Sequence, residues 1–169
     1  MQELMSTAEL KLTLQRMAFQ LVEDLDSLQE VVFIGIQPRG TFISDQLVAI
    51  IREIFPAEKC RYGLLDITFY RDDIRSELHK PNETNIPFSI ENKTVILIDD
   101  VLYTGRTIRA ALDALQDFGR PSKVLLCVLI NRRFNRELPI QPDCFGKAID
   151  TSAGQKVKVL PVEKTVVIY

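Results

Sequence analysis

The most informative segment of the sequence is a pair of adjacent carboxylates followed by a short turn of hydroxyls and glycine. Asp99 and Asp100 end an apolar run, and a turn containing Thr104, Gly105 and Thr107 follows. Neighbouring carboxylates can accept hydrogen bonds from a vicinal diol and can hold Mg²⁺ through water. Hydroxyls and the unpaired N–H groups at a helix start bind phosphate. Each residue alone also fits an ordinary capped strand-to-helix turn, but their combination favours a sugar-phosphate site.

Positioning this site requires a strand before the acids and a helix after the turn, and the rest of the chain predicts the same alternation. Apolar runs at 31–36 and 124–130 are typical of strands buried on both faces. The pattern predicts an α/β fold with a central, mostly parallel sheet flanked by helices, in which ligands bind beyond the carboxyl ends of the strands. The expected helices are 7–28, 41–55 and 105–118, and the expected strands are 31–36, 62–70, 95–98, 124–130 and 165–168.

The composition is that of a globular protein. Of its 169 residues, 46% are hydrophobic and 26% are charged, which predicts a single domain over residues 1–169 and excludes disorder for the whole chain. We expect no membrane association, because no apolar run approaches roughly 20 residues and the N-terminus lacks a signal-peptide pattern. Cys60, Cys127 and Cys144 have no metal-ligand spacing with one another or with His79. They predict reduced thiols in a cytoplasmic protein rather than a zinc site.

Charge is distributed unevenly along the chain. Residues 120–169 contain nine Lys and Arg residues against four Asp and Glu residues, although the formal net charge of the chain is −2. This basic segment is compatible with an anionic partner such as nucleic acid. A solvated face beside a phosphate pocket is the commoner cause of such an asymmetry, so charge alone favours that interpretation.

Residues 95–107 resemble the phosphoribosyl pyrophosphate motif of the type I phosphoribosyltransferases, which joins an apolar run, an Asp-Asp pair and a Thr-Gly-x-Thr turn. The resemblance implies the type I phosphoribosyltransferase fold, with a small hood built from the chain ends. It also implies that Asp99 and Asp100 hold the ribose hydroxyls and, through water, Mg²⁺, while the turn binds the 5′-phosphate. The residues of this motif expected to bind phosphoribosyl pyrophosphate or UMP are Asp99, Asp100, Val101, Leu102, Tyr103, Thr104, Gly105, Arg106 and Thr107.

The segment Gln37-Pro38-Arg39-Gly40 falls where this family places its pyrophosphate loop, which often contains a cis peptide bond. A cis bond before proline costs only about 0.5–1 kcal/mol, so we expect Gln37–Pro38 to be cis, with an ordinary trans turn as the alternative. Arg39 is expected to stabilise the leaving pyrophosphate. Arg71 begins the polar connection 71–89, which is expected to close over the substrate. The expected catalytic residues are therefore Asp99, Asp100, Arg39 and Arg71.

Three segments together resemble one subfamily, the pyrimidine operon attenuation regulators that are also uracil phosphoribosyltransferases. They are 65–73, 99–107 and 136–140, and the similarity extends from about residue 9 to residue 151. Purine-specific relatives carry an Asp immediately before the Thr-Gly pair, where this chain has Tyr103. The resemblance implies transfer of ribosyl 5-phosphate to N1 of uracil, and a homodimer or larger ring. The expected uracil hood consists of Lys147, Ala148 and Ile149.

The subfamily also binds an RNA hairpin of the pyrimidine operon leader when UMP is bound, on a basic surface of the dimer. This chain departs from the subfamily pattern there, at Gln15, Phe19, Asn135 and Gln141. An enzyme that has lost RNA binding, a purine enzyme and a binding module without catalysis are the alternatives, although the complete 99–107 motif argues against the last. The candidate RNA-binding residues are Arg136 and Lys147, which match the subfamily, with Arg132 and Arg133 as candidates for compensation.

Overall fold

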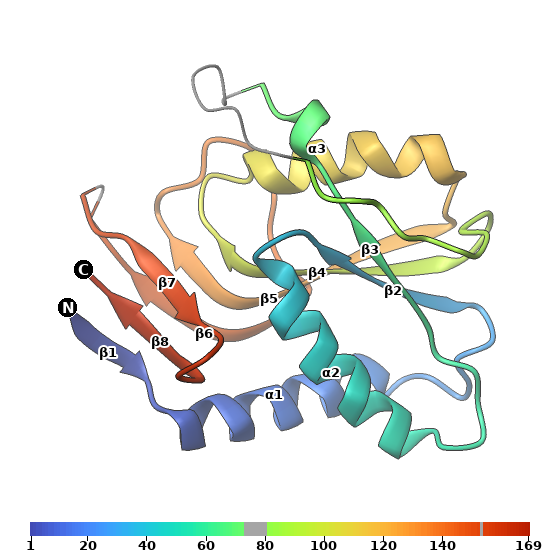
Figure 1. Cartoon of the computed structure of the whole chain (residues 1–169), viewed down its shortest axis with the longest axis horizontal. Coiled ribbons are helices and arrows are strands. Elements are labelled where there is room, and N and C mark those ends of the chain that lie inside the picture. Colours follow the sequence, from blue (N-terminus) through green and yellow to red (C-terminus); the bar gives the residue numbers. More distant parts are fainter. Residues whose placement is uncertain (73–80, 153) are drawn as a thin grey trace.

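A five-stranded parallel sheet runs through the centre of the molecule (Figure 1). The computed structural model describes residues 1–72, 81–152 and 154–169. Within the sheet the strand order is β3-β2-β4-β5-β6, and every neighbouring pair is parallel. All residues of β2 are buried, which is typical of a strand covered on both faces. The strands are β2 (Val31–Ile36), β3 (Arg61–Leu65), β4 (Thr94–Leu102), β5 (Lys123–Arg133) and β6 (Cys144–Asp150).

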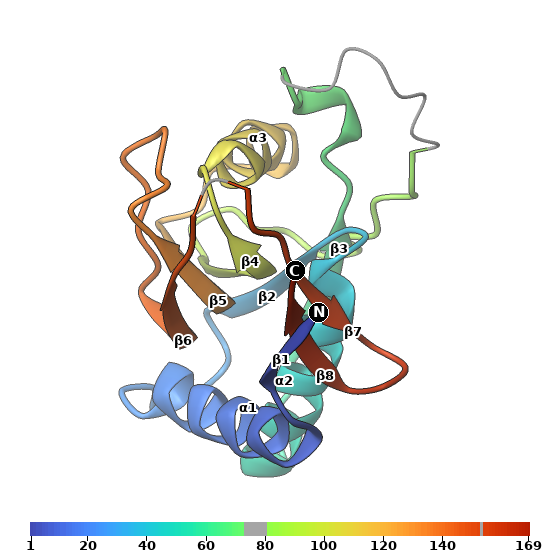
Figure 2. The ribbon, with the colours of Figure 1, turned by 90° about the vertical axis from the view of Figure 1, so that its left-hand side faces the viewer.

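Helices cover both faces of this sheet, as the alternating sequence pattern predicts (Figure 2). Helices α1 (Thr7–Val22) and α2 (Gly40–Ile54) pack on one face, and α3 (Arg106–Leu115) packs on the other. Successive residues of β4 alternate between the two resulting cores: Ile96 and Ile98 join α1 and α2, whereas Val95 and Leu97 join α3. The predicted α/β fold is therefore confirmed.

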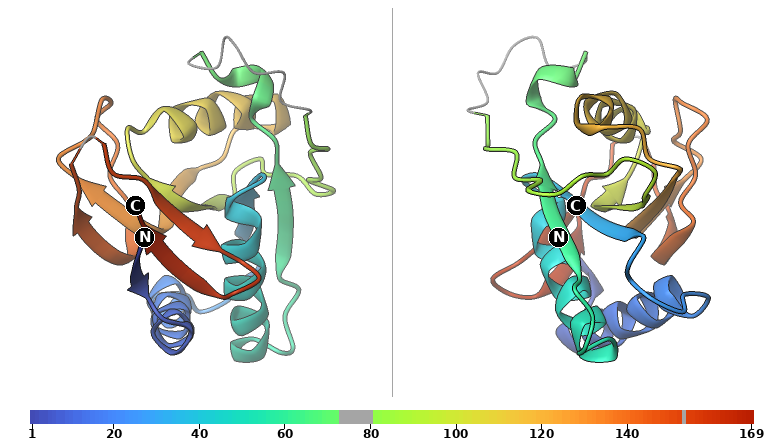
Figure 3. Two further views of the ribbon diagram at one scale, coloured as in Figure 1. Left: turned by 60° about the vertical axis from the view of Figure 1, so that its left-hand side comes forward. Right: turned by 90° about the vertical axis from the view of Figure 1, so that its right-hand side faces the viewer.

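The two ends of the chain build a second, antiparallel sheet with the order β1-β8-β7. Figure 3 shows the N- and C-termini side by side on this sheet. Its strands are β1 (Gln2–Met5), β7 (Val157–Leu160) and β8 (Thr165–Ile168). This arrangement confirms the predicted hood from the chain ends. The sequence pattern does not predict strand β1, because its four residues show no apolar run and pair only with the distant β8.

Two predicted elements end at least five residues earlier than expected. The first helix stops at Val22 rather than at residue 28, because Glu23, Asp24 and Asp26 place negative charge at the negative end of the helix dipole. The predicted strand 62–70 stops at Leu65. There the Asp66 carboxylate accepts hydrogen bonds from Thr68 N (3.4 Å) and Thr68 Oγ1 (2.9 Å), which turn the chain into the short 3₁₀ helix Thr68–Tyr70.

The three cysteines are free thiols, as predicted. Cys127 and Cys144 are buried, whereas Cys60 is half-buried. Across the described ranges, no group of three or more His, Cys, Asp or Glu side chains is arranged to hold a metal ion. His79 lies outside the described residues. None of the helices described combines the length and apolar character needed to cross a membrane.

Candidate active site

A cavity of about 940 Å³ opens at the carboxyl ends of the central strands. Its walls come from the loop after β2, the end of β4, the start of α3, and strand β7 of the small sheet. This is the position at which open α/β sheets bind ligands, because the loops leaving parallel strands meet at one edge. The structure brings the predicted segments 37–40 and 99–107 together at this cavity, which all of their residues line except Gly40.

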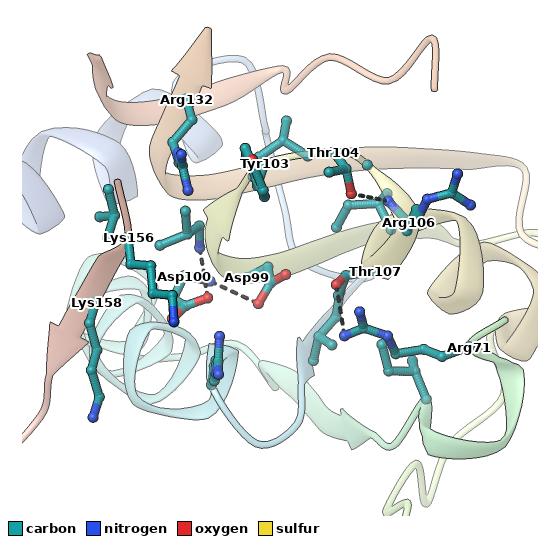
Figure 4. A pocket seen from close by; sticks show the side chains of 18 of the residues that line it. Arg71, Asp99, Asp100, Tyr103, Thr104, Arg106, Thr107, Arg132, Lys156 and Lys158 are labelled. Carbon is teal, nitrogen blue, oxygen red and sulfur yellow. Dashed lines mark hydrogen bonds between the residues drawn. The ribbon is translucent and has the colours of Figure 1, made fainter. Parts of the chain in front are cut away.

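Asp99 and Asp100 lie at the floor of the cavity, near the end of β4 (Figure 4). They are only 4% and 7% exposed. Asp99 Oδ1 accepts a hydrogen bond from Asp100 N (2.9 Å), and Asp100 Oδ1 accepts one from Val101 N (2.7 Å). Burial raises the pKa of both carboxyls, and the negative charge of Asp100 raises the pKa of Asp99 further. The positive charge of Arg39 lowers the pKa of both carboxyls. Such a pair is stabilised by a cation or by hydroxyl donors.

The turn between β4 and α3 has the geometry of an anion site. Gly105 is the N-cap of α3 and adopts φ +95°, a left-handed conformation that favours glycine. Thr104 Oγ1 accepts a hydrogen bond from Arg106 N (3.3 Å), and both threonines of the turn line the cavity. The first amides of α3 have no partner inside the helix, so they and the helix dipole favour an anion here.

The predicted 136–140 motif supports this turn from behind. The Thr104 carbonyl accepts hydrogen bonds from Glu137 N (2.9 Å) and Leu138 N (3.2 Å), and Arg106 Nε donates to Glu137 Oε2 (2.6 Å). Arg136 donates to the Tyr103 carbonyl and to Asn131 Oδ1 (2.7 Å). Arg136, a candidate for RNA contacts in the sequence, is half-buried, and its guanidinium holds the turn through these bonds.

The loop after β2 confirms the expected cis peptide bond at Gln37–Pro38. Gly40 begins α2 directly beside the paired acids. A Cβ atom at this position would lie 2.7 Å from the Ile98 carbonyl oxygen and 3.2 Å from Asp99 Oδ1. Glycine is therefore required for the close approach of this loop to Asp99.

Arg71 lies beside the phosphate turn, where its Nη1 is 3.4 Å from Thr107 Oγ1. The next residue, Asp72, accepts a hydrogen bond from Arg109 (2.6 Å) and pairs with Arg106 (3.6 Å). The beginning of the 71–89 connection is thus held against α3. Residues 73–80, part of the connection expected to close over the substrate, lie outside the described residues.

The predicted uracil hood is not at the cavity. Lys147, Ala148 and Ile149 belong to β6, and Lys147 Nζ donates to the Leu4 carbonyl (3.1 Å). The cavity wall is formed instead by residues 154–158 and Tyr169. Pairing of β7 with β8 brings this segment to the cavity. Its place there depends on that pairing and not on a local sequence motif.

The other basic residues predicted to contact RNA also have partners within the protein. Arg132 is 4% exposed and lines the cavity. Arg133 is exposed and makes two hydrogen bonds to the Asp150 carboxylate (2.8 and 3.0 Å).

Comparisons with known proteins agree with this geometry. Residues 2–163 match the family model of the phosphoribosyl transferase domain. The chain is 45% identical over 158 residues to the bifunctional protein PyrR of Gloeothece citriformis, which covers 93% of this chain and 88% of that protein. It is 44% identical over 159 residues to the bifunctional protein PyrR of Thermus thermophilus, covering 93% and 87% of the two chains.

Solved structures share the fold at low sequence identity. A hypoxanthine phosphoribosyltransferase from Staphylococcus aureus has a TM-score of 0.68 at 21% identity, with 88% of this chain and 77% of that chain covered. A hypoxanthine-guanine phosphoribosyltransferase from Bacillus anthracis has a TM-score of 0.70 at 19% identity, with 88% and 82% covered. At these identities the likeness supports the fold and does not identify the base.

Proposed function

This chain belongs to the phosphoribosyl transferase family, and on that premise we propose that it converts uracil and phosphoribosyl pyrophosphate to UMP and pyrophosphate. The observation that carries the proposal is that Asp99, Asp100 and the anion-binding turn at Gly105 line one cavity. The acids accept hydrogen bonds from the ribose diol, and the turn binds the 5′-phosphate. Tyr103 stands where purine-specific relatives carry an Asp, which favours a pyrimidine base.

In the proposed reaction the bond from N1 of uracil to C1′ forms as the bond from C1′ to the pyrophosphate oxygen breaks. The electron pair of the broken bond leaves on pyrophosphate, and the N1 proton passes to water. The protein contributes by holding the reactants in line and by stabilising charge, because no covalent intermediate is needed. Arg39 supplies positive charge at the leaving pyrophosphate.

Mg²⁺ is the cofactor that the acids are suited to hold. Two carboxylates are too few for an all-protein Mg²⁺ cage, but Mg²⁺ ordinarily retains waters and takes substrate oxygens as further ligands. The buried, mutually repelling pair Asp99 and Asp100 fits such a partial site. When bound, the ion supplies charge neutralisation for the pyrophosphate.

A turnover assay with alternative bases tests this function. We expect pyrophosphate release in the presence of phosphoribosyl pyrophosphate, Mg²⁺ and uracil. With hypoxanthine or guanine in place of uracil we expect at most about 1% of that rate, because an unmatched base leaves buried polar groups unpaired. Turnover of either purine at a rate above that limit would contradict the pyrimidine assignment. Absence of turnover with every base would leave a binding protein.

We propose RNA binding as a second function, because the similarity to proteins named bifunctional PyrR spans 93% of the chain. The proposed ligand is the leader RNA of a pyrimidine operon, bound with UMP by a dimer. Two of the four candidate cations, Arg132 and Arg136, are directed into the protein. Lys147 and Arg133 are the exposed ones and would carry the phosphate contacts.

A gel shift with the operon leader at several salt concentrations tests RNA binding. We expect UMP to strengthen binding and Lys147→Gln to weaken it, with the salt slope falling by about one. Uracil turnover should remain at the wild-type level. Lys59→Gln, an exposed lysine just before β3 at the opposite edge of the sheet, is the control and should bind as the wild type does. RNA binding that UMP does not enhance would contradict the proposed RNA-binding function, and the proposed enzymatic activity would stand.

A further inference from the structure

Arg132 is a buried cation in the wall of the cavity. It belongs to β5 and is 4% exposed, yet it lines the cavity. Within the described part of the chain its hydrogen-bond partners are neutral oxygens: Nε donates to Thr151 Oγ1 (2.8 Å) and Nη2 donates to the Gln155 carbonyl (3.0 Å). A buried charge without a counter-charge is costly unless a ligand compensates it. We propose that Arg132 contacts a carbonyl oxygen of the uracil base and stabilises the negative charge on that base during transfer.

The orientation of Arg132 is fixed by its surroundings. Its guanidinium lies 3.8 Å from the centroid of the Tyr103 ring, a cation–π contact. Asn135 Nδ2 donates to the Thr151 carbonyl (3.0 Å) and so holds the residue whose hydroxyl accepts from Arg132. A planar guanidinium has five N–H donors in a rigid fork. The two hydrogen bonds therefore leave donors for a ligand in the cavity, toward which Figure 4 shows the side chain pointing.

The position of Arg132 assigns it to the base rather than to the sugar or its phosphate. The turn at Thr104–Thr107 takes the 5′-phosphate, and Asp99 and Asp100 take the ribose diol. The 37–39 loop is assigned to pyrophosphate, and Arg71 lies beside the phosphate turn. The wall toward β5 and β7 contains Tyr103, Arg132, residues 154–158 and Tyr169. A base attached at C1′ must occupy this wall, so this step rests on the proposed function.

The charge of Arg132 matches the electronic demand of the reaction. When N1 of uracil loses its proton to water ahead of full bonding to C1′, negative charge spreads onto the carbonyl oxygens of the ring, and it is consumed as the bond from N1 to C1′ is completed. Burial lowers the pKa of Arg132, but a guanidinium remains charged at neutral pH. A cation held in a water-poor site before the reaction begins stabilises charge that develops in the transition state.

A comparison of uracil with 5-fluorouracil tests the inference. Fluorine withdraws electrons and makes the N1 proton more acidic, so the fluorinated base depends less on an external cation. We expect Arg132→Gln to lower kcat/KM for uracil by about 100-fold and that for 5-fluorouracil by only about 10-fold. Arg132→Lys, which keeps the charge, should recover part of the loss with uracil. KM for phosphoribosyl pyrophosphate should change less than about 3-fold in both variants, because Arg132 contacts the base and does not contribute to binding of that substrate.

Arg120→Gln is the matched control, because Arg120 is an exposed arginine just before the other end of β5. It should leave all three parameters unchanged. Equal losses with both bases in Arg132→Gln, or a change confined to the KM of phosphoribosyl pyrophosphate, would overturn the inference. If Arg132→Gln fails to fold, Arg132→Lys provides the test. A larger loss of kcat/KM with uracil than with 5-fluorouracil supports the inference, and equal losses with the two bases overturn it. Absence of wild-type turnover with either base would instead overturn the proposed function.

Discussion

Replacing Asp100 with Asn should lower kcat for UMP formation by at least about 100-fold. Two hydrogen bonds from ribose hydroxyls to a charged acceptor contribute about 1.5–3 kcal/mol each, and the amide reproduces the shape of the side chain without its charge. The measurement is steady-state turnover with uracil, phosphoribosyl pyrophosphate and Mg²⁺. Asp113→Asn, on the exposed part of α3, is the control and should retain wild-type turnover.

The same variant should fold at least as stably as the wild type. Because burial raises the native pKa of Asp100, the folded protein holds a proton that the unfolded chain has released, and stability falls as pH rises from about 4 through the native pKa. The amide introduced by Asp100→Asn cannot titrate, so urea unfolding of the variant should show a smaller fall over this range. Wild-type kcat in Asp100→Asn, or a loss of stability near neutral pH, would contradict the placement of this acid.

Replacing Gly40 with Ala should reduce kcat by about 10-fold or more. The new Cβ would lie 2.7 Å from the Ile98 carbonyl oxygen and 3.1 Å from Asp99 Cα, both backbone atoms. Either β4 or the start of α2 must shift, and small displacements of positioning groups cost orders of magnitude in rate. We also expect the free energy of unfolding to fall by about 1–3 kcal/mol, as in other overpacked sites.

Kinetics and urea unfolding at one temperature separate these two effects of Gly40→Ala. Gln46→Ala, on the exposed face of the same helix, should retain full kcat and a free energy of unfolding within about 0.5 kcal/mol of the wild type. Full activity in Gly40→Ala would show that the approach of this loop to Asp99 is not needed for the reaction.

The parts of the site that are continuous in sequence are predictable from the residues. An apolar run of strand length, two acids, a glycine turn and an apolar-periodic helix follow one another between residues 94 and 115. Their order alone therefore places the acids and the phosphate turn at one edge of the sheet. Strand β2 has the predicted bounds, and the cis bond at Gln37–Pro38 agrees with the expectation drawn from the family resemblance of this loop. Local propensity and hydrophobic periodicity are strong in these segments.

Element ends are less predictable, because single polar contacts decide them. Asp66 ends β3 by binding Thr68, and the acids after Val22 end α1. Strand β4 continues through the acids to Leu102, since β5 pairs with it that far. Neither a side-chain hydrogen bond nor a strand partner is visible in a hydrophobic pattern.

The base-binding wall arises only when the chain folds. Strand β7 reaches the cavity by pairing with β8, and β8 in turn pairs with the N-terminal β1. In the sequence Arg132 is one more basic residue of a positively charged segment, and only the folded chain buries it against Tyr103, Thr151 and Gln155. The chemistry at the sugar and its phosphate is thus local in the chain. Recognition of the base depends on contacts between residues that are far apart in the chain, from Arg132 with Gln155 to Gln2 with Ile168, which no short motif encodes.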